Sequence, residues 1–194
     1  MSYDSLVLHN SPVLHSHSPF FTACRSGNKE YVIQMLKGHT DIDVKDIDVN
    51  KVYEWDNLIG SYGQTVLYDA CYRGDFDIVT VLLNQPGIDV NKSNEYQPGY
   101  INGDTPLKGA ISGSMSKDTR VKIVSALLAH PDINVDVNKS NNDGSTPYEL
   151  AIELQQNAIV KMLLEKSKAI AKNTKAVVGQ VDSQSAYFKL FQKM

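Results

Sequence analysis

Four short segments of this chain resemble one another, and this repeat constrains the fold more than any other feature of the sequence. Each segment begins with Ser or Thr, three of them have Pro in second place, and each ends with Ala followed by Cys or Ile. The four copies are residues 18–24, 65–71, 105–111 and 146–152. Self-similarity of this kind is typical of architectures in which each unit buries its apolar face against its neighbours.

Each copy is predicted to open an α-helix. Ser or Thr can accept hydrogen bonds from the first free backbone N–H groups of a helix, and Pro at the first helical position has no N–H to leave unpaired. Val66 is the one departure from Pro. Apolar residues at i, i+3 and i+4 then predict a second helix after a short turn in every copy. The predicted second helices are residues 30–36, 77–83, 122–128 and 158–164.

Three of the predicted second helices are followed by alternating apolar and polar residues that include Asp-Val-Asn. These stretches are residues 41–44, echoed in 46–50, then 87–91 and 135–138. Alternation with a period of two predicts extended segments, as in the arms of a hairpin.

The order of helix, turn, helix and Asp-Val-Asn finger, with the Thr-Pro-Leu-x-x-Ala opening at Thr105, resembles the ankyrin-repeat family. The resemblance covers residues 16–166. It implies an all-α solenoid of helix–turn–helix pairs with β-hairpin-like fingers. The implied division is an N-terminal segment or cap (1–17), four repeats (about 18–50, 63–93, 103–140 and 144–166), and a C-terminal linker and capping helix (167–194).

The repeats are longer than the ankyrin period of about 33 residues. Equivalent positions 19, 66, 106 and 147 lie 47, 40 and 41 residues apart, so the chain carries insertions. We expect these in the fingers at 51–62 and 94–102, in the turn of the third repeat at 114–119, and in the last finger at 134–137.

The C-terminal segment carries its own apolar pattern. Tyr187, Leu190, Phe191 and Met194 fall on one helical face, and residues 173–183 read as a linker before them. A terminal repeat has one face without a neighbour and needs a cap. We therefore predict a capping helix on the fourth repeat, with a separate docking or targeting segment as the alternative.

The charge balance and apolar content exclude several classes of partner. There are 19 basic and 22 acidic residues, a net charge of −3, and no extended basic stretch, so nucleic acid is not expected as a partner. No apolar run approaches the roughly 20 residues that cross a bilayer, and the first residues do not resemble a secretory signal. We expect no membrane insertion and a cytoplasmic location.

The residue types that carry catalysis or metal binding are not arranged for it. His9, His15 and His17 lie near one another, but no Cys or acidic residue follows at a familiar metal spacing. Neither a nucleophilic triad nor a glycine-rich phosphate loop occurs. Cys24 and Cys71 occupy the same repeat position, where a buried free thiol is expected. We predict a non-enzyme without cofactor or metal.

The family resemblance implies a protein-binding scaffold whose concave face, formed by finger tips and inner helices, meets another protein. Several aromatic residues fall in or beside the inserted fingers, and Tyr, Trp and Arg dominate binding hot spots. The alternative is that a long finger folds back and buries its own aromatics. The predicted protein-binding residues are Tyr53, Trp55, Tyr62, Asp69, Tyr72, Arg73, Tyr96 and Tyr100.

Three further hypotheses keep this fold and change its role. A short, divergent ankyrin protein with irregular insertions resembles the effectors that intracellular bacteria deliver into host cells, which would place it in the host cytoplasm. It can also recruit substrate beside an enzyme. Homotypic assembly through the tail helix is the third, against our expectation of a monomer.

Overall fold

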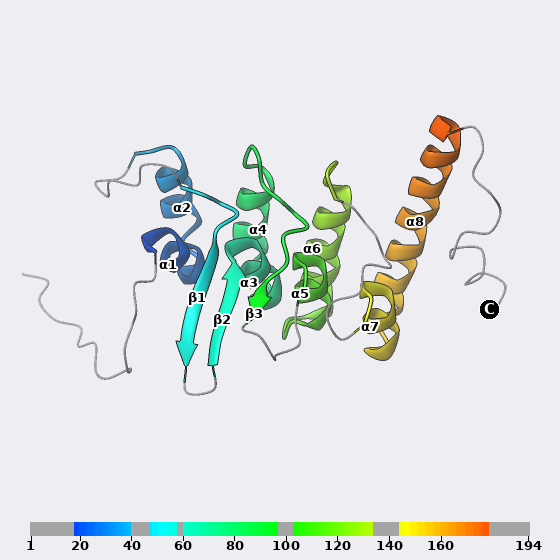
Figure 1. The fold of residues 1–194 in the computed structure, drawn as a ribbon, viewed down its shortest axis with the longest axis horizontal. Helices are drawn as coiled ribbons and strands as arrows, with labels where there is room; N and C mark the ends of the chain where they lie inside the picture. The colour runs from blue at the N-terminus through cyan, green and yellow to red at the C-terminus, as the bar shows by residue number, and fades with distance from the viewer. Residues whose placement is uncertain (1–17, 40–46, 58–59, 97–102, 134–143, 179–194) are drawn as a thin grey trace, which may run out of the picture.

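The computed structural model describes residues 18–39, 47–57, 60–96, 103–133 and 144–178. Figure 1 shows helix pairs stacked along one axis, with a β-hairpin beside the first two pairs. The elements in chain order are α1 (Pro19–Ser26), α2 (Lys29–Leu36), β1 (Val52–Asn57), β2 (Gly60–Thr65), α3 (Val66–Arg73), α4 (Phe76–Leu83), β3 (Glu95–Tyr96), α5 (Pro106–Ser112), α6 (Lys117–Ala129), α7 (Pro147–Glu153) and α8 (Asn157–Val178).

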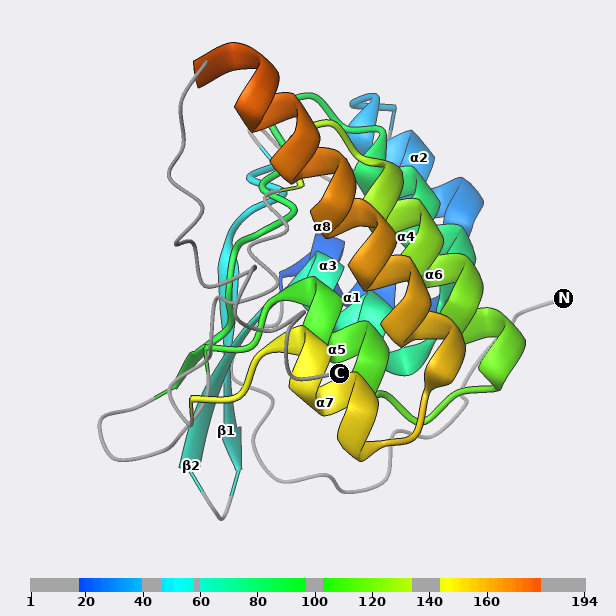
Figure 2. The same cartoon turned by 90° about the vertical axis from the view of Figure 1, so that its right-hand side faces the viewer.

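The helices form two layers. The inner layer contains α1, α3, α5 and α7, and the outer layer contains α2, α4, α6 and α8 (Figure 2). Each inner helix packs on the outer helix that follows it and on the inner helices of adjacent pairs. The predicted solenoid of helix–turn–helix pairs is therefore confirmed. Within the described ranges, none of the helices combines the length and apolar character needed to cross a membrane.

The core runs between the two layers through positions that recur from repeat to repeat. Five of the residues buried there are Phe20, Phe21, Leu67, Leu107 and Ile159. Two further residues, Phe76 and Val121, are partly buried and pack against this core.

Three of the four predicted N-caps form. The side chains of Thr65, Thr105 and Thr146 accept hydrogen bonds from the backbone N–H groups of Tyr68, Lys108 and Glu149. Ser18 does not cap α1 with its side chain. Its hydroxyl instead hydrogen-bonds to the side chain of Tyr53, so the first repeat exchanges a helix cap for a contact with the hairpin.

Two predicted boundaries are wrong. Residues 117–119 were expected in a turn but belong to α6, because Ser116 caps this helix by accepting from the Thr119 N–H at 3.2 Å. Residues 173–178 of the predicted linker at 173–183 are helical, because α8 continues to Val178 and no Pro or Gly occurs within α8; residues 179–183 lie outside the described residues. The predicted tail face of Tyr187, Leu190, Phe191 and Met194 lies outside the described residues.

The first insertion forms the longest strands of the described chain. β1 and β2 pair in antiparallel register from Val52 opposite Thr65 to Asn57 opposite Gly60. β3 adds two residues to the other edge of β2, giving the strand order β1-β2-β3. The hairpin projects past the inner helices (Figure 2), and Thr65 both ends β2 and caps α3, so the finger is tied directly to an inner helix.

The Asp-Val-Asn segments, predicted to be extended, form turns where they are described. The carboxylates of Asp48 and Asp89 accept from the backbone N–H of the Asn two residues later, each at 2.9 Å. This local bond competes with extended backbone. The predicted stretches 41–44 and 135–138 lie outside the described residues.

The Asn of each turn joins one repeat to the next. The amide of Asn50 donates to the Gly87 carbonyl at 2.8 Å and accepts from the Asp89 N–H at 2.7 Å. Asn91 repeats the donated bond one unit later, to the Asp132 carbonyl at 2.9 Å. The Asn residues of the Asp-Val-Asn turns therefore form a ladder of hydrogen bonds between successive fingers.

Replacing Asn50 with Leu, which has nearly the same shape, should remove both bonds to the next finger. We expect a loss of about 1–2 kcal/mol in the free energy of unfolding, measured by urea titration, because each net hydrogen bond contributes roughly 0.5–1.5 kcal/mol. Asn84→Leu is the matched control, since within the described residues the Asn84 side chain makes only a local bond, to the Thr80 carbonyl. Equal losses in the two variants would contradict the ladder.

Candidate functional site

The hairpin register brings three of the predicted binding residues into one row. Trp55 lies directly opposite Tyr62 in β2, and Tyr62 lies directly opposite Tyr96 in β3. Residues directly opposite one another in a sheet share a face, with strands about 4.8 Å apart. Three residues separated by up to 41 positions in the sequence thus become neighbours. Tyr100 lies outside the described residues.

Tyr53, at the base of the same hairpin, lies in the core. Only 8% of it is exposed. Its ring centroid is 4.8 Å from that of Phe21, and the Lys51 ammonium lies 5.7 Å from the ring centroid. Burial raises the pKa of Tyr53, while the hydrogen bond from Ser18 opposes that rise. Tyr53 therefore anchors the hairpin to α1 rather than offering a contact surface, as the alternative of an inward-folded finger anticipates.

Asp69 and Arg73 form a partly buried link between the first two repeats. Arg73 Nε donates to Asp69 Oδ2 at 2.9 Å, and Arg25 Nε lies 3.8 Å from the same oxygen. Arg73 also donates from Nη1 to the Arg25 carbonyl at 3.0 Å and from Nη2 to the Cys24 carbonyl at 3.2 Å. These carbonyls belong to the last turn of α1, the end of a helix at which a cation is favoured. We call this group the arginine clamp: Arg25, Asp69 and Arg73.

Tyr72 is the predicted residue whose described side chain is most exposed, at 44%. Its ring stacks on Tyr68, with centroids 6.2 Å apart and planes 12° from parallel. A side chain at Gly113 would collide with the Tyr72 carbonyl oxygen, and one at Gly109 would come within 3.0 Å of the Tyr68 ring. α5 therefore approaches α3 closely only because it carries glycine at both positions, and this holds the tyrosine pair in place.

Sequence reasoning missed one buried charge, Lys108 in α5. Lys108 is only 3% exposed. Its ammonium lies 3.1 Å from the Asp104 carboxylate and donates a hydrogen bond to the Ser145 carbonyl at 3.0 Å. A buried charge is tolerated when it is paired and hydrogen-bonded. The available signal was a Lys in the first turn of a helix that is otherwise apolar. Lys108 joins the third repeat to the fourth, as the arginine clamp joins the first to the second.

The two cysteines are buried free thiols. Burial raises the pKa of Cys24 from 9.0 to about 12, with a further rise from the charge of Asp69. Burial alone raises the pKa of Cys71. Because the thiolate is the reactive form, neither residue is poised as a nucleophile or metal ligand.

Metal ligands do not gather in the part of the chain that the structure covers. There, no three His, Cys, Asp or Glu side chains come together as a metal site. His9, His15 and His17, the histidines considered for a metal, lie outside the described residues.

The N-terminal half of the chain matches a known family model. Residues 4–94 match the model described as ankyrin repeats (3 copies). No curated protein matches the chain. The matched range contains the arginine clamp, Tyr72 and both long strands of the hairpin.

Replacing Arg73 with Met should destabilise the fold by about 2 kcal/mol, because it leaves a buried carboxylate with one distant partner and removes two bonds to the end of α1. Chemical denaturation measures this loss. Arg25→Met is the control and should cost less than about 1 kcal/mol, since Arg25 lies farther from Asp69 and is more exposed. A larger loss from Arg25 than from Arg73 would contradict this assignment of the clamp.

Stability should fall as pH rises above about 9. Burial raises the pKa of Cys24 to about 12 in the folded state, from 9.0 in the unfolded chain. The protonated thiol therefore contributes its full stability below pH 9.0, and this contribution is lost as pH rises from 9.0 toward the folded-state pKa. Melting temperatures between pH 8 and 10 should decline less in a Cys24→Ala, Cys71→Ala variant than in the wild type. An equal fall in melting temperature in the two proteins would show that the thiols do not cause the loss of stability at alkaline pH.

Proposed function

The chain belongs to the ankyrin-repeat family, whose members are generally protein–protein interaction modules, and we propose that it binds a partner protein through one aromatic surface. This surface consists of the cross-strand row Trp55, Tyr62 and Tyr96 together with Tyr72. A partner lying across both would contact the hairpin and the inner helices at once, and the binding energy would come mainly from these few residues.

The cross-strand row is the observation that carries the proposal. With strands about 4.8 Å apart, three directly opposed positions span about 10 Å of one sheet face. Binding hot spots are clusters of this size, enriched in Trp, Tyr and Arg. Aromatic residues in an inserted finger can thereby act as a single patch.

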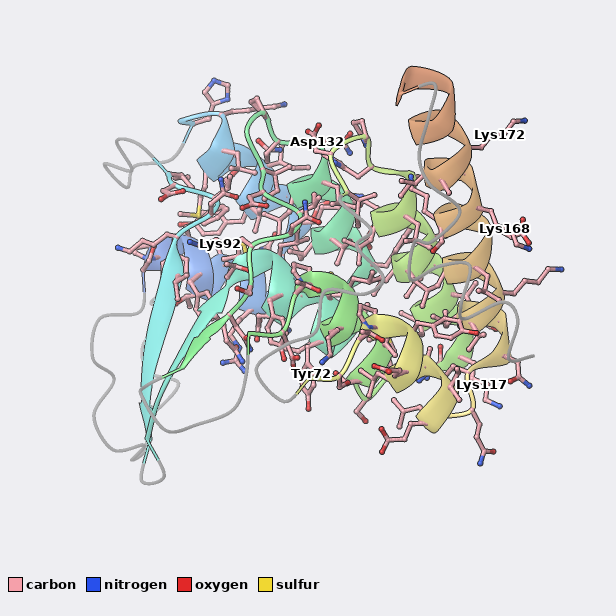
Figure 3. The ribbon with its side chains drawn as sticks, turned by 45° about the vertical axis from the view of Figure 1, so that its right-hand side comes forward. Tyr72, Lys92, Lys117, Asp132, Lys168 and Lys172 are labelled. Carbon is pink, nitrogen blue, oxygen red and sulfur yellow. The ribbon has the colours of Figure 1, made fainter. Side chains whose placement is uncertain are left out.

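Tyr72 extends this patch to the helical layer. It is half-exposed on α3, and Figure 3 places it at the edge of the inner helices, on the side where the hairpin extends past them. The arginine clamp and the stacked Tyr68 hold α3 in place before any partner arrives. A surface ordered in advance loses less conformational entropy on binding.

Ankyrin repeats are typically non-catalytic, and we propose a scaffold without enzymatic activity that acts as a monomer. Two free thiols among the described residues favour a reducing compartment such as a cytoplasm. Delivery into a host cell and substrate recruitment beside an enzyme would use the same surface and differ only in the source of the partner.

The test is capture of partners from cell lysate by the wild type and by a Trp55→Ala, Tyr72→Ala double variant. We expect the double variant to bind the captured partner roughly 100-fold more weakly, since each hot-spot truncation costs at least about 1–2 kcal/mol. Lys122→Ala, which shortens an exposed side chain on the outer helix α6, is the control and should bind as the wild type does.

Circular dichroism spectra and melting temperatures of all three proteins should agree before binding is compared. Equal capture of the same partner by the double variant and the wild type would refute the aromatic surface. Arg73 is not substituted in this test, because its loss would weaken the fold as well as the surface.

A further inference from the structure

The fourth repeat exposes an apolar residue at a position that every earlier repeat buries. Cys24, Cys71 and Ile111 follow the repeated Ala of the first three repeats, and each is at most 1% exposed. Ile152 holds the same position in α7 and is 50% exposed. In the first three repeats the inner helix of the following repeat packs on the helix that carries this site.

The outer helix of the fourth repeat shows the same change. Val32, Val79 and Val124 are each 0% exposed, whereas the equivalent Val160 in α8 is only partly buried. No described helix pair follows α8 (Figure 1). We call the resulting apolar surface the end face: Ile152 and Val160.

We propose that residues 187–194 of this chain cover the end face by folding back along α8. This segment has apolar residues at Tyr187, Leu190, Phe191 and Met194, spaced i, i+3, i+4 and i+7. That spacing gives one apolar stripe on a helix, which matches the apolar Ile152 and Val160 of the end face. Packing the stripe on the end face would remove apolar side chains of both from water.

The connecting chain is long enough for this return. Val160 and Val178 are 18 residues apart within α8, or about 27 Å at 1.5 Å per residue. Residues 179–186 and their flanking bonds reach about 30 Å when fully extended. Tyr187 can therefore come level with any point on α8 back to the end face, and Gly179 permits the reversal at the end of the helix.

Hydrogen-exchange mass spectrometry on the full chain tests the proposal. A Leu190→Ala, Phe191→Ala variant should exchange the amides of residues 147–164 at least tenfold faster than the wild type. The matched control, Lys189→Ala with Gln192→Ala, changes the residues on either side, which lie off the stripe, and should leave these rates unchanged. Equal rates in the stripe variant and the wild type would overturn the proposal.

A substitution on the other partner gives an independent readout. Ile152→Asp places a charge on the end face without changing the tail, and amides of residues 187–194 should then exchange at the rate of an unstructured peptide. Unchanged protection of the tail would overturn the proposal.

The remaining occupant of the end face is a second copy of the chain. Protection of residues 147–164 should be the same across a hundredfold range of protein concentration, with a monomer mass by light scattering. Protection that grows with concentration would instead assign the end face to dimer formation and overturn the intramolecular cap.

Discussion

The structure depends on one constraint: no repeat can bury its own apolar surface, so each must be covered by the next. The small residues Ala23, Ala70, Ala110 and Ala151 are at most 4% exposed, and they let inner helices approach closely. The Cys or Ile that follows each Ala is buried only where another repeat comes after it, so its burial depends on that repeat and not on the residue type. Stability in such an array is approximately a sum of repeat terms and interface terms between neighbours.

Polar residues reinforce these interfaces instead of interrupting them. Asn50, Arg73 and Lys108 each bond to backbone carbonyls of an adjacent repeat, at 2.8–3.2 Å. Each of the three thereby links one repeat to the next. Polar side chains at repeat boundaries therefore fix the register that the apolar contacts alone leave adjustable.

Local patterns predicted the helices and the core, because Thr caps, Pro at the first helical position and i, i+3, i+4 spacing act within one turn. The hairpin pairing could not be predicted from such patterns, because the pairing of Trp55 with Tyr62 and of Tyr62 with Tyr96 depends on strand register between distant residues. The burial of Tyr53 depends on α1. Arg73 was predicted as a contact residue because its type is common in hot spots, whereas in the structure its guanidinium donates to two carbonyls at the end of α1.

The same nearest-neighbour logic separates the two surfaces proposed for this chain. The aromatic surface belongs to the first two repeats and the finger that follows them, whereas the end face belongs to the fourth, with α5 and α6 between them. A change at one end alters the interface terms of its own repeat and the next one only. In these two proposals the end face sets how firmly the last repeat is held, and the hairpin sets what the protein binds. Loss of the cap at one end would then leave the aromatic surface at the other end in place.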